Sequence, residues 1–225
     1  MSRVLSALIL LTVLTLPGCD GRSSKASPAA PGDASGQPQA RPVVVVLGDS
    51  LTAGPGLPAS SAYPALLQQR ASDAGLPHRI VNAGVSGDTS TDGLRRLEGA
   101  LTADTRVLVV ALGANDGLRG VAVSTVKRNL SEIIVRAKAR GIKVLLAGME
   151  TPPSRGWQYS VDFHFIYPDL AREHEVPLMP FLLAGVFGDA ALNLPDGFHP
   201  NADGMRAIAA AMWPCLEPVL RETSR

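Results

Sequence analysis

The sequence has few of the features that mark several common classes of protein. Only two of its 225 residues are cysteines, and one of them, Cys19, closes the apolar N-terminal segment. Cys215 is then left alone, which excludes an intrachain disulfide in the rest of the chain. Aromatic residues make up only 4% of the chain, against 22 glycines and 18 prolines. This balance is typical of an α/β protein with many short loops and argues against a sandwich or a bundle.

A strong charge of either sign is also missing. The formal net charge is +1, and no basic run is longer than Arg95-Arg96. A surface that follows a phosphate backbone needs clustered lysines and arginines, so we expect no nucleic-acid partner. No two histidines have the tight spacing of metal ligands, and neither Gly-Lys-Ser/Thr nor a complete G-x-G-x-x-G opens a helix. We therefore expect no metal and no cofactor.

The apolar run near the N-terminus is too short to span a bilayer. It covers 13 residues, Val4 to Leu16, whereas a membrane-spanning helix needs about 20. A preceding arginine and small residues before Cys19 instead predict a secretory signal over residues 1–19. The segment LPGC that ends it resembles a bacterial lipobox, although Pro17 replaces the usual small residue. We expect an exported, periplasmic protein linked to the membrane only by a lipid on Cys19, with ordinary signal cleavage as the alternative.

Composition divides the rest of the chain into a linker and one domain. Residues 20–41 are rich in proline, alanine, serine and glycine, which predicts a flexible linker. From residue 42 to residue 225, short apolar runs alternate with helix-compatible segments. The expected strands are 43–47, 79–81, 107–112, 144–147 and 178–179, and the expected helices are 61–74, 91–101, 121–140, 162–174 and 202–220. This alternation predicts a three-layer α/β/α domain with five parallel strands, covered on both faces, in a flavodoxin-like order.

Polar segments follow the expected strands, where a parallel sheet collects its ligands. The first strand runs into Gly48-Asp49-Ser50, and the segment DGFHPN near the end of the chain places Asp196 three residues before His199. That spacing lets a carboxylate fold back onto an imidazole and fix its tautomer. A serine hydroxyl becomes a nucleophile when such an oriented imidazole removes its proton. The residues therefore predict a catalytic triad of Ser50, His199 and Asp196.

The same reaction needs hydrogen-bond donors for the oxyanion that forms on the attacked carbonyl. The backbone N–H groups of Ser50 and Gly87 and the side-chain amide of Asn115 are suited to this role. Gly87 lacks a Cβ, so a substrate can approach its backbone closely. Asn115 lies in the segment GANDG, which follows the third expected strand. We expect these three groups to form an oxyanion hole.

Taken in order, these segments resemble the four blocks of the SGNH, or GDSL, hydrolases, and their spacing covers the whole domain. The blocks are Gly48-Asp49-Ser50-Leu51, Gly87, Gly113-Ala114-Asn115-Asp116 and Asp196-Gly197-Phe198-His199. The segments NAGVSGDTS, LGANDGLRG and DGFHPN look most like the bacterial periplasmic arylesterase, acyl-CoA thioesterase and lysophospholipase subgroup. The resemblance implies Ser50 as nucleophile, Asp196 and His199 as the rest of the triad, and Ser50, Gly87 and Asn115 as oxyanion donors. It also implies a flavodoxin-like sheet, a monomer and no cofactor.

We interpret the chain as an exported serine esterase that acts on aryl esters, acyl thioesters or lysophospholipids through an acyl-enzyme on Ser50. The first alternative is a carbohydrate O-acetylesterase, because the same blocks serve that chemistry in related enzymes. The second is a tethered binding module without activity, since fold alone does not imply catalysis. Its signature would be decay of the triad, and every member is present.

Other polar residues near these segments have simpler expected roles. Asp49, Asp88 and Asp116 are expected to accept backbone N–H groups within their loops rather than act as bases. His164 lies in the aromatic-rich segment WQYSVDFHFIYPDL. We expect it either at the edge of an acyl pocket or on the surface of a helix.

Overall fold

The computed structural model describes residues 41–224. The predicted secretory signal and lipobox, and the predicted linker up to residue 40, lie outside the described residues. Among the residues that are described, no helix is both long enough and apolar enough to cross a membrane.

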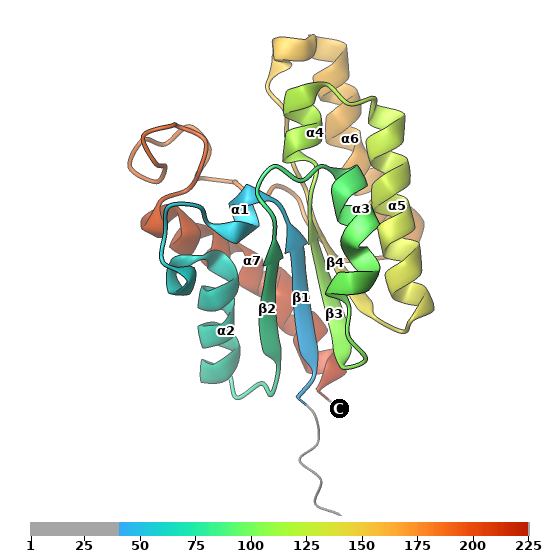
Figure 1. Ribbon diagram of the computed structural model, residues 1–225, viewed down its shortest axis with the longest axis vertical. Coiled ribbons are helices and arrows are strands. Elements are labelled where there is room, and N and C mark those ends of the chain that lie inside the picture. The colour runs from blue at the N-terminus through green and yellow to red at the C-terminus, as the bar shows by residue number, and fades with distance from the viewer. Residues whose placement is uncertain (1–40, 225) are drawn as a thin grey trace, which may run out of the picture. The chain divides into compact units, whose positions relative to one another are not determined.

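Five parallel strands form one sheet in the middle of the domain (Figure 1). Their spatial order is β2-β1-β3-β4-β5, which confirms the predicted flavodoxin-like order. Because all pairs are parallel, the carboxyl ends of the strands meet at one edge of the sheet, at the top of Figure 1. The strands are β1 (Val43–Gly48), β2 (Arg79–Gly84), β3 (Thr105–Ala111), β4 (Lys143–Ala147) and β5 (Leu178–Met179).

Helices cover both faces of this sheet. Helices α3, α5 and α6 pack next to one another on one face, and α2 packs beside α7 on the other. The helices are α1 (Ser50–Ala53), α2 (Tyr63–Asp73), α3 (Ser90–Ala100), α4 (Ala114–Arg119), α5 (Val123–Ala139), α6 (Trp157–His174) and α7 (Ala202–Thr223), with short 3-10 turns at Ala59–Ser61 and Pro153–Arg155. The two short helices, α1 and α4, were not expected from the sequence. Helix α6 begins five residues before the predicted start at 162.

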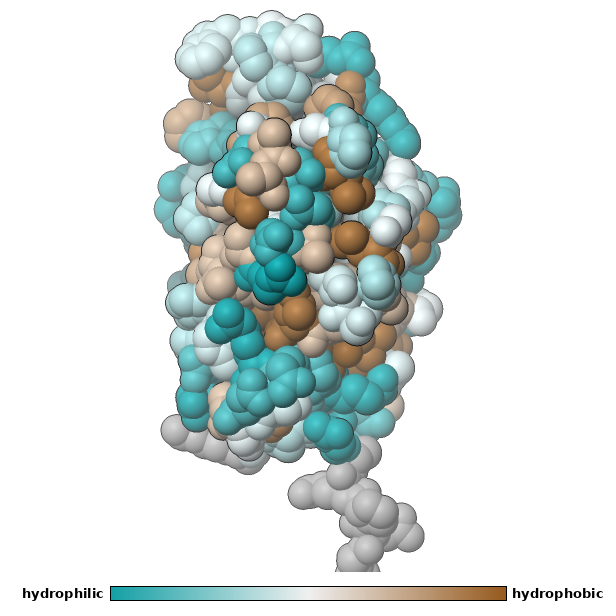
Figure 2. Space-filling view, turned by 90° about the vertical axis from the view of Figure 1, so that its left-hand side faces the viewer, coloured by the Kyte–Doolittle hydropathy of each residue, from teal (hydrophilic) through white to brown (hydrophobic). Residues whose placement is uncertain are grey.

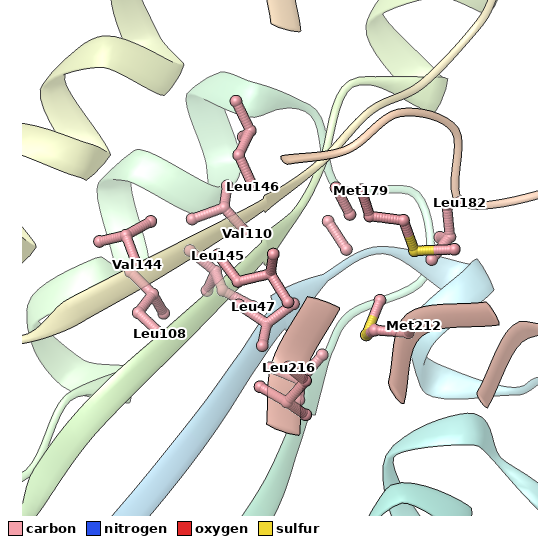
Figure 3. Packing of buried hydrophobic residues seen from close by; sticks show 14 of the residues in the cluster. Leu47, Leu108, Val110, Val144, Leu145, Leu146, Met179, Leu182, Met212 and Leu216 are labelled. Carbon is pink, nitrogen blue, oxygen red and sulfur yellow. The ribbon is translucent and has the colours of Figure 1, made fainter. Parts of the chain in front are cut away.

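The core lies between the central strands and the helices. The five residues of β1 from Val43 to Leu47 are at most 1% exposed, because helices cover both faces of this central strand. Leu47 and Leu145 of the sheet lie near Leu216 and Met212 of α7 in Figure 3. Burial of each such side chain contributes about 1.5–3 kcal/mol to folding. The edge strand β2 differs from the expectation of full cover, since none of its six residues is fully buried.

Glycines bring the first short helix against the ends of two strands. A Cβ on Gly48, the last residue of β1, would collide with the side chain of Thr52. A Cβ on Gly84, the last residue of β2, would lie 2.9 Å from Cα of Ala53. Helix α1 can therefore pack directly onto the carboxyl ends of β1 and β2, and its first residue is Ser50.

Candidate active site

The three predicted triad residues meet although they are far apart in the sequence. Nε2 of His199 lies 2.9 Å from Oγ of Ser50, across 149 residues of chain. Nδ1 of His199 lies 2.7 Å from Oδ2 of Asp196. A carboxylate only accepts hydrogen bonds, so Nδ1 carries the proton of the neutral imidazole and Nε2 is free to accept the serine proton.

A tight turn fixes the carboxylate of Asp196. Its Oδ1 accepts hydrogen bonds from the backbone N–H groups of His199 and Phe198, each at 2.9 Å. These bonds, of which that from His199 is the stronger influence, lower the pKa of Asp196 to about 2. The turn passes through Gly197 at a φ of +74°, a region that favours glycine. Asp196 therefore stays ionised over the pH range in which an imidazole titrates.

The loop that carries His199 is held from both sides. The backbone N–H of Leu194 donates to the carbonyl of His199 at 2.7 Å. Two residues later Asn201 caps α7, with Oδ1 accepting from the N–H groups of Asp203 and Gly204. The amide of Asn201 also donates to Ala191 O at 2.8 Å. These bonds position the imidazole before any substrate is bound.

The predicted oxyanion donors lie in the same cavity as the triad. Ser50, Gly87 and Asn115 all line it, together with His199. Gly87 has a φ of +85° in a turn that Asp88 closes by donating its N–H to Val85 O at 3.2 Å. The three groups chosen from the sequence therefore lie at one site, and their catalytic roles stay a prediction.

The side-chain amide of Asn115 is held by protein acceptors in this structure. Nδ2 donates to Asp88 O at 3.0 Å and to Oδ2 of Asp49 at 3.4 Å. An amide nitrogen has two hydrogens, so each contact takes one. The contact with Asp49 is the longer and weaker one. An incoming oxyanion would therefore compete with Asp49 for the amide.

Arg96 joins two of the loops that form the site, and the sequence analysis missed it. From α3, its Nε donates to Oδ2 of Asp88 at 2.5 Å and its Nη2 to Gly48 O at 2.8 Å. Both side chains are largely buried, so the pair is shielded from solvent. The expectation that Asp88 accepts backbone N–H groups is wrong, because its carboxylate accepts a hydrogen bond from the buried guanidinium of Arg96 instead. A helical arginine beside a second arginine gives no sequence signal for this role.

Asp49 and Asp116 behave as expected, since both accept backbone N–H groups. Asp49 accepts from Leu51 at 2.9 Å, and Asp116 accepts from the N–H and Oγ of Ser90, each at 2.7 Å. Both carboxyl groups are buried beneath the loops. Burial raises the pKa of Asp49 to about 6 and also raises the pKa of Asp116.

The triad opens into a cavity of about 880 Å³ with mainly apolar walls. Two of its lining side chains, Phe187 and Phe198, remain more than half exposed. Figure 2 shows one side of the molecule, with hydrophobic residues at several places above a mostly hydrophilic lower end. His164 does not line the cavity. It is an exposed residue of α6 whose Nδ1 lies 2.7 Å from Oε1 of Glu150, a residue that does line the cavity, so His164 lies on the helix surface next to the cavity wall.

A doubly wound sheet with a hydrogen-bonded serine, histidine and aspartate at the carboxyl ends of its strands is the arrangement of a serine hydrolase. In the part of the chain that is described, no group of three or more His, Cys, Asp or Glu is arranged to hold a metal ion.

Comparisons with known proteins agree with this class. A sequence profile of the GDSL-like Lipase/Acylhydrolase family matches residues 46–207. The chain is 41% identical over 185 residues to Esterase TesA of Pseudomonas aeruginosa, covering 82% of this chain and 92% of that protein. It is 39% identical over 182 residues to Thioesterase 1/protease 1/lysophospholipase L1 of Escherichia coli K12, covering 80% and 86%. A crystal structure of TesA matches with a TM-score of 0.75 and 40% identity, covering 79% of this chain and 99% of that one.

The chain belongs to the GDSL-like lipase/acylhydrolase family. The resemblance inferred from the four sequence blocks is confirmed, and so is the fold that it implied. Because its relatives are an esterase and a thioesterase, the chain is a carboxylic ester hydrolase. The alternative of a binding module without activity therefore loses its support.

Proposed function

We propose that the enzyme hydrolyses esters and thioesters through an acyl-enzyme on Ser50. The observation that carries this proposal is the continuous contact from Ser50 through His199 to Asp196. In the first half-reaction Nε2 of His199 takes the proton of Oγ, and Oγ bonds to the substrate carbonyl carbon. As the tetrahedral intermediate collapses, the bond to the leaving group breaks and His199 gives that group the proton. In the second half-reaction, Nε2 of His199 takes a proton from a water molecule, and the water oxygen bonds to the acyl carbon. The bond between that carbon and Oγ then breaks, Oγ regains the proton from His199, and the acid is released.

The oxyanion is proposed to form against Ser50 N–H, Gly87 N–H and the amide of Asn115. All three residues line the cavity that holds Oγ. The amide would exchange its weak bond with Asp49 for a bond to the oxyanion, which carries developing charge. Its bond to Asp88 O would keep it in place during this exchange.

Asn115→Ala tests this assignment. We expect kcat to fall by about 10²–10³-fold, with KM changed by less than about threefold, because the bond matters mainly in the transition state. Steady-state kinetics with p-nitrophenyl butyrate would measure both constants, and the thermal midpoint would show whether the loops remain folded. An unchanged kcat in a folded variant would remove Asn115 from the oxyanion hole.

The cavity supports substrates with acyl chains longer than acetyl. Its volume of about 880 Å³ and its apolar walls are suited to bury several methylene groups. The names of the relatives, which include a thioesterase and a lysophospholipase, support thioesters and lysophospholipids as substrate classes. A carbohydrate O-acetylesterase, the alternative, would gain nothing from such an apolar volume.

Chain-length preference separates these two functions. We expect kcat/KM for p-nitrophenyl octanoate to exceed that for the acetate by about tenfold or more, since each buried methylene contributes up to about 0.8 kcal/mol. Initial rates at substrate concentrations below KM would measure the ratio, and acetyl-xylan would serve as the competing substrate. A preference for acetate together with release of acetate from acetyl-xylan would establish the alternative instead.

We also propose that the enzyme is exported and acts as a monomer in the periplasm. Support for export comes only from the residues before the domain: the short apolar run, and the lipobox-like segment that ends at Cys19. Lipid on Cys19 would tether the domain through the predicted linker of residues 20–41. Monomeric state rests on the resemblance to small monomeric relatives.

A further inference from the structure

The cavity has one negatively charged residue in its wall. Among the described residues that line it, only Glu150 and His199 can ionise, and His199 belongs to the triad. Glu150 lies three residues after the end of β4, and Phe181 lies two residues after the end of β5. The loops that hold them are joined because Leu182 N–H donates to Gly148 O at 2.9 Å. A carboxylate and an aromatic ring therefore lie on joined loops in the wall of a mainly apolar cavity.

The charge of Glu150 is not neutralised by a lysine or an arginine. In the described part of the chain no such group lies within 4.0 Å of its carboxylate, and its one close contact is Nδ1 of His164. That contact uses Oε1. A carboxylate can accept about four hydrogen bonds, so most of its capacity is unused. About a third of the side chain is exposed, at 36%, so an entering ligand can reach it.

Three aromatic rings line the same cavity as Glu150. Phe181 and Phe187 pack edge to face with centroids 6.5 Å apart, and Phe198 lines the cavity beside the triad. The faces of aromatic rings attract cations, and so does a carboxylate. From this combination we propose that Glu150 makes the enzyme selective for esters that carry an ammonium group over their neutral isosteres. This inference rests on the proposed ester hydrolysis in this cavity.

The apolar walls would strengthen such selectivity. Charges interact more strongly beside low-dielectric walls than in open water, although the partial exposure of Glu150 moderates the effect. An ammonium group with methyl substituents is poorly hydrated and has an apolar surface, so it fits the cavity shape as its carbon isostere does. The ammonium group also activates the ester inductively, to the same extent in wild type and variant, so the change of the ratio in Glu150→Gln reports the contribution of the Glu150 charge.

Two pairs of isosteres and one variant test the proposal. In the first pair the charge lies on the alcohol: the butyrate ester of choline is compared with its neutral isostere, 3,3-dimethylbutyl butyrate. In the second pair the charge lies on the acyl group: the p-nitrophenyl ester of 4-(trimethylammonio)butyrate is compared with that of its neutral isostere, 5,5-dimethylhexanoate. We expect the cationic-to-neutral ratio of kcat/KM to exceed one in at least one pair. In Glu150→Gln that ratio should fall by about fivefold or more, since the amide keeps the shape and removes the charge.

Glu132→Gln is the matched control. Glu132 lies on α5, is similarly exposed and pairs with Arg136 away from the cavity. We expect its ratios to equal those of the wild type. Ratios of one or less in both wild-type pairs, or ratios that Glu150→Gln leaves unchanged, would overturn the proposal.

The outcome is separable from that of the proposed function. Failure of the wild type to hydrolyse the neutral esters would overturn ester hydrolysis itself, and with it the premise of the proposal. If Glu150→Gln does not fold, inhibition of the wild type answers the same question. Choline and its neutral isostere 3,3-dimethylbutanol would compete with p-nitrophenyl butyrate, and we expect choline to have the lower inhibition constant. Equal constants would overturn the proposal.

Discussion

Replacing Ser50 with alanine should lower kcat for ester hydrolysis by about 10⁶-fold, to the rate that binding and oxyanion stabilisation alone provide. The variant keeps the cavity but has no Oγ to bond to the carbonyl carbon. Ser50 is the first residue of α1, and its side chain contacts Nε2 of His199 without carrying a structural hydrogen bond elsewhere in the described chain. The fold should therefore tolerate the change. Steady-state hydrolysis of p-nitrophenyl butyrate and a thermal unfolding curve would measure both effects.

Ser86→Ala provides the control for this experiment. Ser86 lines the same cavity, but no hydrogen bond joins it to His199 in the described structure. Its variant should keep activity within about threefold of the wild type, because a residue outside the triad has no part in proton transfer. A folded Ser50→Ala enzyme with substantial activity, or an equal loss in Ser86→Ala, would contradict the assignment of Ser50 as nucleophile.

Much of the fold could be predicted because the signals are local. The run of four valines and a leucine before Gly48 indicates a buried parallel strand, and the structure places all five residues in the core. The same holds for the order of the strands, since right-handed crossovers leave few arrangements. Helices α1 and α4 could not be predicted in this way. Each is at most six residues long, too short for an amphipathic pattern to repeat.

That the candidate site residues come together could be predicted, but their environment could not. Ser50 and Asn115 stand out because their motifs follow strands whose ends meet in a parallel sheet, and His199 stands out by its spacing from Asp196. The raised pKa of Asp49 depends on burial by residues from several loops, which no local pattern records. Arg96 shows the same limit, because its contacts with Gly48 and Asp88 are 48 and 8 residues away.

Replacing the carboxylate of Asp196 with an amide should have the second large effect on kcat. In Asp196→Asn, the amide oxygen can still accept the N–H groups of Phe198 and His199 that Oδ1 accepts now. The amide nitrogen then faces Nδ1 of His199 as a donor, which forces the imidazole proton onto Nε2. An imidazole in that tautomer cannot take the proton of Ser50. We therefore expect kcat to fall by about 10⁴-fold while the turn remains intact.

Asp203→Asn separates this effect from a general loss of charge near α7. Asp203 lies four residues after His199, pairs with Arg206 and has no contact with the triad in the described chain. We expect full activity in this variant and an unchanged fold in both, as measured by kcat and thermal unfolding. If Asp196→Asn lost less than about tenfold in kcat, Asp196 would serve only to close the turn. The imidazole would then keep its working tautomer without a carboxylate, and Ser50 with His199 would act as a dyad.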